Sequence, residues 1–463
     1  MEAGNGAAID SSSRNYSGPV AGKKGSLPNV GNRSDLVGPQ NRRLYSLPAW
    51  LNRMRLRWST RSQRPTGTMI PQGLSEKESS HYETLIDVVA ARPGLKKKQP
   101  RVVVITDLAK DYDDLAAMVV LKELHRLGVI KLLGFIANLM PANKRAQFGR
   151  GALDSLGLQS IPIAQGTSGF PRSARRKHDE LPYEFQCDFM ATDARVSNEG
   201  GGEELLRKLC EEARRTGERL TLVLISSLED IYTFSSKYAD LLRDSVSNIV
   251  LQGGYSISED GKLEPDEAAN NNRYDMDAAK EFHAFMQENE IESSVYTKVA
   301  AFATPLTSEL FAEMAETKHP LGIHLRRVQV TQDLSFYKTA CRENPKERFA
   351  TFMDQEWFLK NKTSWFDEPH APDTPYPIGE EVIPWLTKVI VYDALAALGA
   401  SGSDALEALK VLTHNNTHPP SIHQIVGFAG PPSDPGVDPE QMASVLSALL
   451  KGSLLSSPPQ SKR

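Results

Sequence analysis

The segment VVVITDLAKDYDDLAAMVVL, residues 102–121, decides the fold because it joins an apolar, β-branched run to an apolar run of helical length. The composition of residues 102–106 predicts a buried strand, and that of residues 113–128 predicts a helix. Four aspartates lie at the junction: Asp107, Asp111, Asp113 and Asp114. The segment therefore predicts a strand that passes into a helix through a strongly acidic turn.

The same order, a strand-length apolar run followed by a helix-length amphipathic run, recurs along residues 102–288. This alternation is typical of βαβ units, and it predicts an α/β fold with a Rossmann-like, mainly parallel open sheet flanked by helices. Residues 309–319 and 382–400 are also predicted to be helical. In such sheets ligands bind beyond the carboxyl ends of the strands.

Composition divides the 463 residues into three parts. Residues 1–97 lack a hydrophobic period and predict a disordered basic tail. Residues 98–425 predict the α/β domain, and residues 426–463 predict a Pro-rich C-terminal tail with one helix at about 438–452. Residues 41–64 carry seven arginines and no acid, which fits either a solvated tail or a short basic helix on an anionic surface.

Charge and cysteine content limit the function classes. Residues 1–101 hold 17 Lys and Arg against 7 Asp and Glu, whereas the remaining residues hold 37 against 51. An acidic body argues against a nucleic-acid surface and is compatible with a cation site. The three cysteines show no disulfide or zinc spacing, and no apolar stretch is long enough for a membrane span. We expect a cytoplasmic protein; the sequence is compatible with a homo-oligomer.

The acidic turn has two explanations. Asp111 as N-cap and Asp114 three residues later would form a capping arrangement at the positive end of the helix dipole. Four acids exceed what capping uses, and they would repel one another unless a cation or shared protons compensated. A hard cation such as Ca²⁺ or Mg²⁺ favours oxygen ligands. This chemistry favours a metal or catalytic site.

A strand that ends in Asp and is followed by an Asp-Asp pair at a helix start resembles the inosine-uridine preferring nucleoside hydrolase family, whose signature is D-x-D-P-G-x-D-D. The resemblance covers about residues 102–400. Six further stretches match family motifs in order: GFIAN (134–138), IPIAQGT (161–167), LTLVLISSLEDI (220–231), IVLQGG (249–254), NNNRYDMDAAKEF (270–282) and VIVYDALAAL (389–398).

This resemblance implies the nucleoside hydrolase fold and hydrolysis of an N-ribosidic bond of a small-molecule riboside with the help of Ca²⁺. The implied metal ligands are Asp107, Asp114, Asp393 and the main-chain carbonyl of Ile225. The implied contacts to the ribosyl group are Asp113, Asn138 and Asn271. Glu267 lies two residues from the position of a further substrate-binding Glu, which is Ala269 in this chain.

The chain departs from the family at positions that carry the chemistry. The general-base Asp of the signature falls on Ala109, and its Pro-Gly falls on Lys110 and Asp111. The spacing is similar to that of a divergent branch with T-D-I-G-x-D-x-D-D, so Asp111 or Asp107 is expected to supply the missing catalytic carboxylate. A late His of the family falls on Tyr392. Two hypotheses follow: a divergent nucleoside hydrolase-like enzyme, or an inactive member that acts as a ligand-binding or scaffold module.

Overall fold

The structure, a computed structural model, describes residues 69–457 except 96, 172, 174–180, 182, 193–194, 197–200, 260, 372, 414–421 and 431. The arginine-rich segment 41–64 lies outside the described residues. Helices and strands alternate from α2 to β5, and the full order along the chain is α2 (Glu76–Leu95), β1 (Arg101–Thr106), α3 (Asp113–Arg126), β2 (Lys131–Ala137), α4 (Ala142–Ser155), β3 (Ile163–Gln165), α5 (Gly201–Thr216), β4 (Leu220–Leu224), α6 (Glu229–Ser245), β5 (Val246–Gln252), β6 (Tyr255–Ile257), β7 (Leu263–Pro265), α7 (Asn270–Arg273), α8 (Met276–Glu288), β8 (Glu292–Tyr296), α9 (Lys298–Ala303), β9 (Leu306–Thr307), α10 (Ser308–Glu316), α11 (Pro320–Ala340), α12 (Gln355–Lys362), β10 (Lys388–Val389), α13 (Tyr392–Gly399), α14 (Ser403–Leu409), β11 (His423–Val426) and α15 (Pro439–Leu455).

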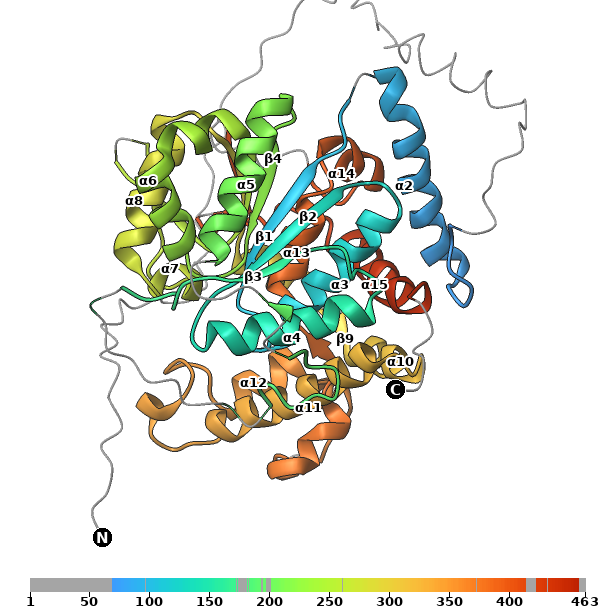
Figure 1. The fold of residues 1–463 in the computed structure, drawn as a ribbon. Coiled ribbons are helices and arrows are strands. Elements are labelled where there is room, and N and C mark those ends of the chain that lie inside the picture. The colour runs from blue at the N-terminus through green and yellow to red at the C-terminus, as the bar shows by residue number, and fades with distance from the viewer. Residues whose placement is uncertain are drawn as a thin grey trace, which may run out of the picture. The chain divides into compact units, whose positions relative to one another are not determined.

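The central sheet has seven strands in the order β11-β8-β5-β4-β1-β2-β3, and all of its pairings are parallel. Strand β1 lies between β4 and β2, so its carboxyl end is at the middle of the sheet edge where ligands bind in this fold class (Figure 1). The predicted fold class, a parallel α/β sheet flanked by helices, is confirmed.

Helices cover both faces of the sheet because both faces of its central strands are apolar. In β1, Val102 and Val104 belong to a core shared with α3, α13 and α15, whereas Val103 and Ile105 belong to a core shared with α5, α6 and α8. Figure 1 shows these two helix groups on opposite sides of the sheet. The period of two along a strand explains why a continuous apolar run predicts a strand buried on both faces.

Two helices extend the core beyond the predicted limits of the α/β domain. Residues 76–95, assigned from sequence to the tail, form α2, whose Tyr82 is fully buried and donates a hydrogen bond to Glu123 Oε1 at 2.8 Å. The helix predicted at 438–452 is α15, and Leu446 and Leu449 on it are fully buried in the core that contains α3. The packed unit therefore includes residues on both sides of the expected 98–425 range.

The helix predicted for residues 382–400 is wrong in its first half. Residues 379–385 form a short 3-10 helix, residues 388–389 form β10, and only α13, starting at Tyr392, is α-helical. Pro384 removes a backbone donor, and the β-branched run Val389–Val391 favours extended backbone. The break places Asp393 in the first turn of α13 instead of in the middle of a longer helix.

Within the described residues, every helix is too short or too polar to cross a membrane.

Candidate functional site

The β1–α3 turn is held by Asp114, which binds back to the end of β1. Its Oδ1 accepts hydrogen bonds from the Thr106 hydroxyl and, at 3.0 Å, from the Asp107 main-chain N–H. The N-cap of α3 is Tyr112, and no side chain caps the helix there. The capping explanation of the acidic turn therefore does not hold, because the aspartates tie the turn together or point at one another.

Three of the predicted carboxylates form a group that can hold a metal ion. Ligand oxygens of Asp111, Asp113 and Asp114 lie within 4.8 Å of one another. Asp113 and Asp114 are buried, and Asp111 is partly exposed. We call these three residues, with Asp107 and Asp393, the carboxylate cluster.

Burial raises the pKa values of the Asp113, Asp114 and Asp393 carboxyl groups well above their usual range, and neighbouring carboxylates raise them further. Oδ1 of Asp111 is buried without a hydrogen-bond partner among the described residues, and the buried Oδ2 of Asp107 has Lys110 Nζ as an ion-pair partner at 3.3 Å. An unsatisfied carboxylate oxygen and a surplus of negative charge are what a bound divalent cation would compensate. The residues of the cluster therefore fit a hard cation with oxygen ligands.

Asp393 joins the cluster from the other half of the chain. It is buried, and its pKa is raised by burial, Asp111 and Asp107. The hydroxyl of Tyr112 donates to the Ile390 carbonyl at 3.1 Å, which fixes the start of α3 against the segment before α13. Ile225 follows β4, and its main-chain N–H donates to Ile105 at 3.0 Å. Two of the expected metal-site residues, Asp107 and Ile225, thus directly follow β1 and β4, and the other two, Asp114 and Asp393, lie in the first turns of α3 and α13.

Lys110 adds a positive charge to the cluster. Its Nζ lies 3.3 Å from Asp107 Oδ2, 3.9 Å from Asp111 Oδ2 and 5.0 Å from the ring centroid of Tyr274. Burial lowers the pKa of Lys110, but Asp107, Tyr274 and Asp111 raise it by more, so that it lies well above its ordinary value. The family signature places Pro in this position, so the sequence resemblance gave no reason to expect the ammonium group.

Arg145 on α4 positions the acidic turn, and sequence reasoning missed it. Its fully buried guanidinium donates to the main-chain carbonyls of Asp107 at 3.1 Å and Leu108 at 2.9 Å. It also donates to Leu139 and Met140 in the turn after β2, and it forms an ion pair with Glu184 at 3.0 Å. One side chain therefore links the turns that follow β1 and β2. No signal in the sequence separates Arg145 from Lys144 and Arg150 on the same helix.

The three predicted substrate-binding residues outside the cluster lie in different environments. Asn138 is fully buried: its Nδ2 donates to Asp230 at 2.8 Å and to the Ser227 carbonyl at 3.0 Å, and its Oδ1 accepts from Ser226. Asn271 is buried beside the end of β5 and donates to Gln252 Oε1 at 2.7 Å. Glu267 lies on the surface. Of the three, Asn138 is the one whose amide is engaged at both ends.

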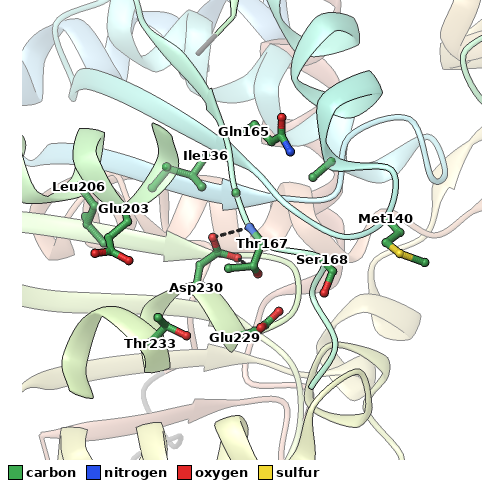
Figure 2. A pocket seen from close by; sticks show the side chains of 13 residues that line it. Ile136, Met140, Gln165, Thr167, Ser168, Glu203, Leu206, Glu229, Asp230 and Thr233 are labelled. Atoms are coloured by element: carbon green, nitrogen blue, oxygen red, sulfur yellow. Dashed lines mark hydrogen bonds between the residues drawn. The ribbon is translucent and has the colours of Figure 1, made fainter. Parts of the chain in front are cut away.

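A separate cavity of about 460 Å³ lies near the starts of α4, α5 and α6 (Figure 2). Asp230 lines it and accepts hydrogen bonds from the Thr167 main-chain N–H at 2.9 Å and its hydroxyl at 2.6 Å. Glu229 and Glu203 also line it, and acids at helix starts are favoured by the helix dipoles. None of the predicted site residues lines this cavity.

Comparison with known proteins shows the fold. No protein-family model and no curated protein matches the sequence. The type III effector protein XopQ, complexed with adenosine diphosphate ribose, is 24% identical, with a TM-score of 0.67 over 82% of this chain and 100% of that chain. The effector protein XOO4466 is 22% identical, with a TM-score of 0.65 over 82% and 99%.

The similarity to nucleoside hydrolases that the motifs indicated is also found among solved structures. The purine-preferring ribonucleoside hydrolase from Gardnerella vaginalis is 14% identical, with a TM-score of 0.47 over 76% of this chain and 99% of that chain. The chain shares its α/β architecture with these proteins.

Proposed function

We propose that this chain is a metal-dependent enzyme that hydrolyses the N-ribosidic bond of a nucleoside or related riboside at the carboxylate cluster. The observation that carries the proposal is the group of the partly exposed Asp111 and the buried Asp113 and Asp114, beside the buried Asp107 and Asp393. The XopQ structure supports a ribosyl-containing ligand, since that protein was solved with adenosine diphosphate ribose. Ca²⁺ suits an all-oxygen site with this many carboxylates.

Asp107, Asp114 and Asp393, with the Ile225 carbonyl, form the proposed ligand set, and Asp111 and Asp113 lie within reach of the same ion. A divalent cation bound there would offset the carboxylate charge and lower the pKa of a water molecule for attack on the ribosyl carbon. Asp113 and Asn271 are proposed to accept and donate hydrogen bonds to ribosyl hydroxyls. Asn138 holds the end of β2 in place through Asp230.

Asp111 is the better candidate for the general base that Ala109 cannot supply. Its side chain is 22% exposed, so that the carboxylate reaches solvent, and its buried Oδ1 has no hydrogen-bond partner among the described residues. Asp107 is only 2% exposed and lies closer to Lys110. A base has to lie within hydrogen-bond reach of the water it deprotonates, and a carboxylate at the mouth of the cluster meets this requirement better than one beneath it.

Binding without turnover is the second candidate function. It is favoured by Ala109 and Tyr392, which remove the acid and the imidazole that the resembling family carries at these positions. A protein of this kind would keep the metal and ribosyl contacts and act as a ligand-binding or scaffold module. The two functions differ only in whether bound riboside is cleaved.

A paired experiment tests the proposal. The melting temperature is measured with chelator and with Ca²⁺, and release of the free base is measured over a panel of nucleosides and ADP-ribose. The enzyme proposal predicts stabilisation by Ca²⁺ and release that Asp111→Asn abolishes. Stabilisation without release from any substrate would favour the binding module, and the absence of both would contradict the site.

A further inference from the structure

Lys110 is held in a constrained turn that aims its side chain at the cluster. The residue before it, Ala109, is 4% exposed and has a φ of 72°, a left-handed conformation that costs a residue with a Cβ about 1–2 kcal/mol. The Lys110 main-chain N–H then donates to the Asp107 carbonyl at 3.2 Å, which closes the turn. The turn therefore holds Ala109 in a strained conformation, and this conformation places the Lys110 ammonium group next to Asp107.

The ammonium group is held by two carboxylates and one aromatic ring. Asp107 and Asp111 are its ion-pair partners at 3.3 and 3.9 Å, and Tyr274, at the end of α7, presents its ring face at 5.0 Å. The Lys110 side chain is 26% exposed, whereas that of Asp107 is only 2% exposed. An ion pair with one buried partner is screened less by water than a surface pair. The charge of Lys110 therefore acts strongly on Asp107.

Lys110 is the only cationic side chain within ion-pair distance of the cluster in the part of the chain that the structure describes. Arg145, the other nearby cation, donates to main-chain carbonyls of the turn and pairs with Glu184. Five carboxylates thus have one resident positive charge. A divalent ion bound to Asp107 would come close to the same ammonium group and be repelled by it.

We propose that Lys110 is a built-in cation of the carboxylate cluster, which competes with the divalent metal for Asp107 and thereby sets how tightly the metal binds. This proposal rests on the proposed metal site. In the metal-free protein the ammonium neutralises Asp107. When the metal binds Asp107, the Lys110 side chain leaves Asp107, and its ammonium group retains the cation–π contact with the Tyr274 ring.

The direct test compares Ca²⁺ affinity, measured by calorimetry on the full chain, for wild type, Lys110→Met and Lys110→Arg. Lys131→Met is the matched control, because Lys131 is exposed at the amino-terminal end of β2 and its loss changes the net charge equally. We expect Lys110→Met to tighten Ca²⁺ binding at least about tenfold. The electrostatic repulsion between an ammonium group and a neighbouring divalent ion exceeds the free energy of about 1.4 kcal/mol that corresponds to a tenfold change in affinity. Lys110→Arg and Lys131→Met should stay near wild type. Equal or weaker binding by Lys110→Met would overturn the proposal.

A second measurement uses the unaltered protein and so does not depend on how a variant folds. Lysines are acylated with a limiting amount of reagent, and the modification of Lys110 relative to Lys131 is measured by peptide mass spectrometry with chelator and with Ca²⁺. Displacement from Asp107 should increase the relative reactivity of Lys110 when Ca²⁺ is present. Unchanged or lower reactivity despite bound Ca²⁺ would contradict the competition. Absence of Ca²⁺ binding in wild type and in Lys110→Met alike would instead contradict the proposed metal site, so the two failures are distinguishable.

Discussion

At the scale of single residues, the site depends on what stands at positions 109 to 111. Ala109 puts a methyl group where the resembling family has its base, and Lys110 brings a cation. Asp111 brings a carboxylate that shares a ligand group with Asp113 and Asp114. The sequence showed the four acids and the missing base. It could not show that Lys110 turns toward Asp107, because that depends on the φ of 72° at Ala109 and on Tyr274, which lies far along the chain.

Restoring the acid should raise activity if the base limits the reaction. We expect Ala109→Asp to increase the rate of ribose release by about two orders of magnitude, the lower range for a positioned general base. Ala109→Gly is the matched control: it relieves the left-handed strain, adds about 1 kcal/mol of stability and supplies no carboxylate. Initial rates on the best nucleoside of the panel measure both. An equal increase in both variants would assign the effect to the backbone instead of the acid.

Arg145 is predicted to be the most sensitive single position of the turn. Arg145→Met removes the guanidinium from its buried ion pair with Glu184 and from four main-chain carbonyls. Loss of one partner of a buried pair costs about 3–5 kcal/mol. Urea denaturation should show this loss in the free energy of unfolding, whereas Arg207→Met on the exposed face of α5 should leave it nearly unchanged. A small effect at Arg145 would mean that the turns after β1 and β2 are held by other contacts.

At the scale of elements, the strands and most flanking helices follow from the sequence because their apolar periods are strong. The predicted strand at 102–106 and the helix that starts at residue 113 agree with β1 and α3. Helix α2 was missed because its polar and apolar residues do not form a clear stripe, and its burial depends on contacts such as Arg92 with Asp404. Partners more than 300 residues away cannot be recognised from a local pattern.

Helix α15 should be essential to the α/β core. Leu446 is fully buried in the core shared with α3 and α13, so Leu446→Ala is expected to lower the free energy of unfolding by about 2–5 kcal/mol. Glu440→Ala, on the exposed first turn of the same helix, serves as the control and should have little effect. Chemical denaturation measures both. Equal, small effects would mean that α15 is a loosely attached tail, as composition alone indicated.

At the scale of the whole molecule, the fold brings acids from both halves of the chain to one edge of the sheet. Asp107 and Asp393 are far apart in sequence, yet Asp107 contributes to the raised pKa of the Asp393 carboxyl group. Helix α13, which carries Asp393 in its first turn, packs against α3, and α3 begins at the acidic turn that follows β1. The existence of the edge could be predicted from sequence. The distances that decide which carboxylates share an ion could not.

A buried histidine makes the stability of the whole chain depend on pH. Burial lowers the pKa of His283 to about 3, with a smaller effect of His423, and its Nε2 has no partner among the described residues. The folded chain keeps His283 neutral while the unfolded chain takes up a proton below pH 6.5. Stability is therefore lost as pH falls from 6.5 toward 3, by about 1.4 kcal/mol per pH unit.

His283→Phe keeps an aromatic ring against Tyr255 and should remove this contribution. The free energy of unfolding is measured for wild type and variant at pH 7.5 and at pH 5.5. Between these two pH values, wild type should lose about 1 kcal/mol of stability relative to the variant. An equal change in the free energy of unfolding of both proteins between these pH values would show that His283 is able to take up a proton in the folded protein.

The central claim is that the aspartates of the β1–α3 turn form a metal site, and Ca²⁺-dependent stabilisation of Asp114→Asn tests it most directly. Asp277→Asn, an exposed residue in the first turn of α8, is the control for the same chemical change. With saturating Ca²⁺ in place of chelator, the melting temperature of wild type and Asp277→Asn should rise, and that of Asp114→Asn should stay constant. A rise in Asp114→Asn equal to that of wild type would contradict the claim.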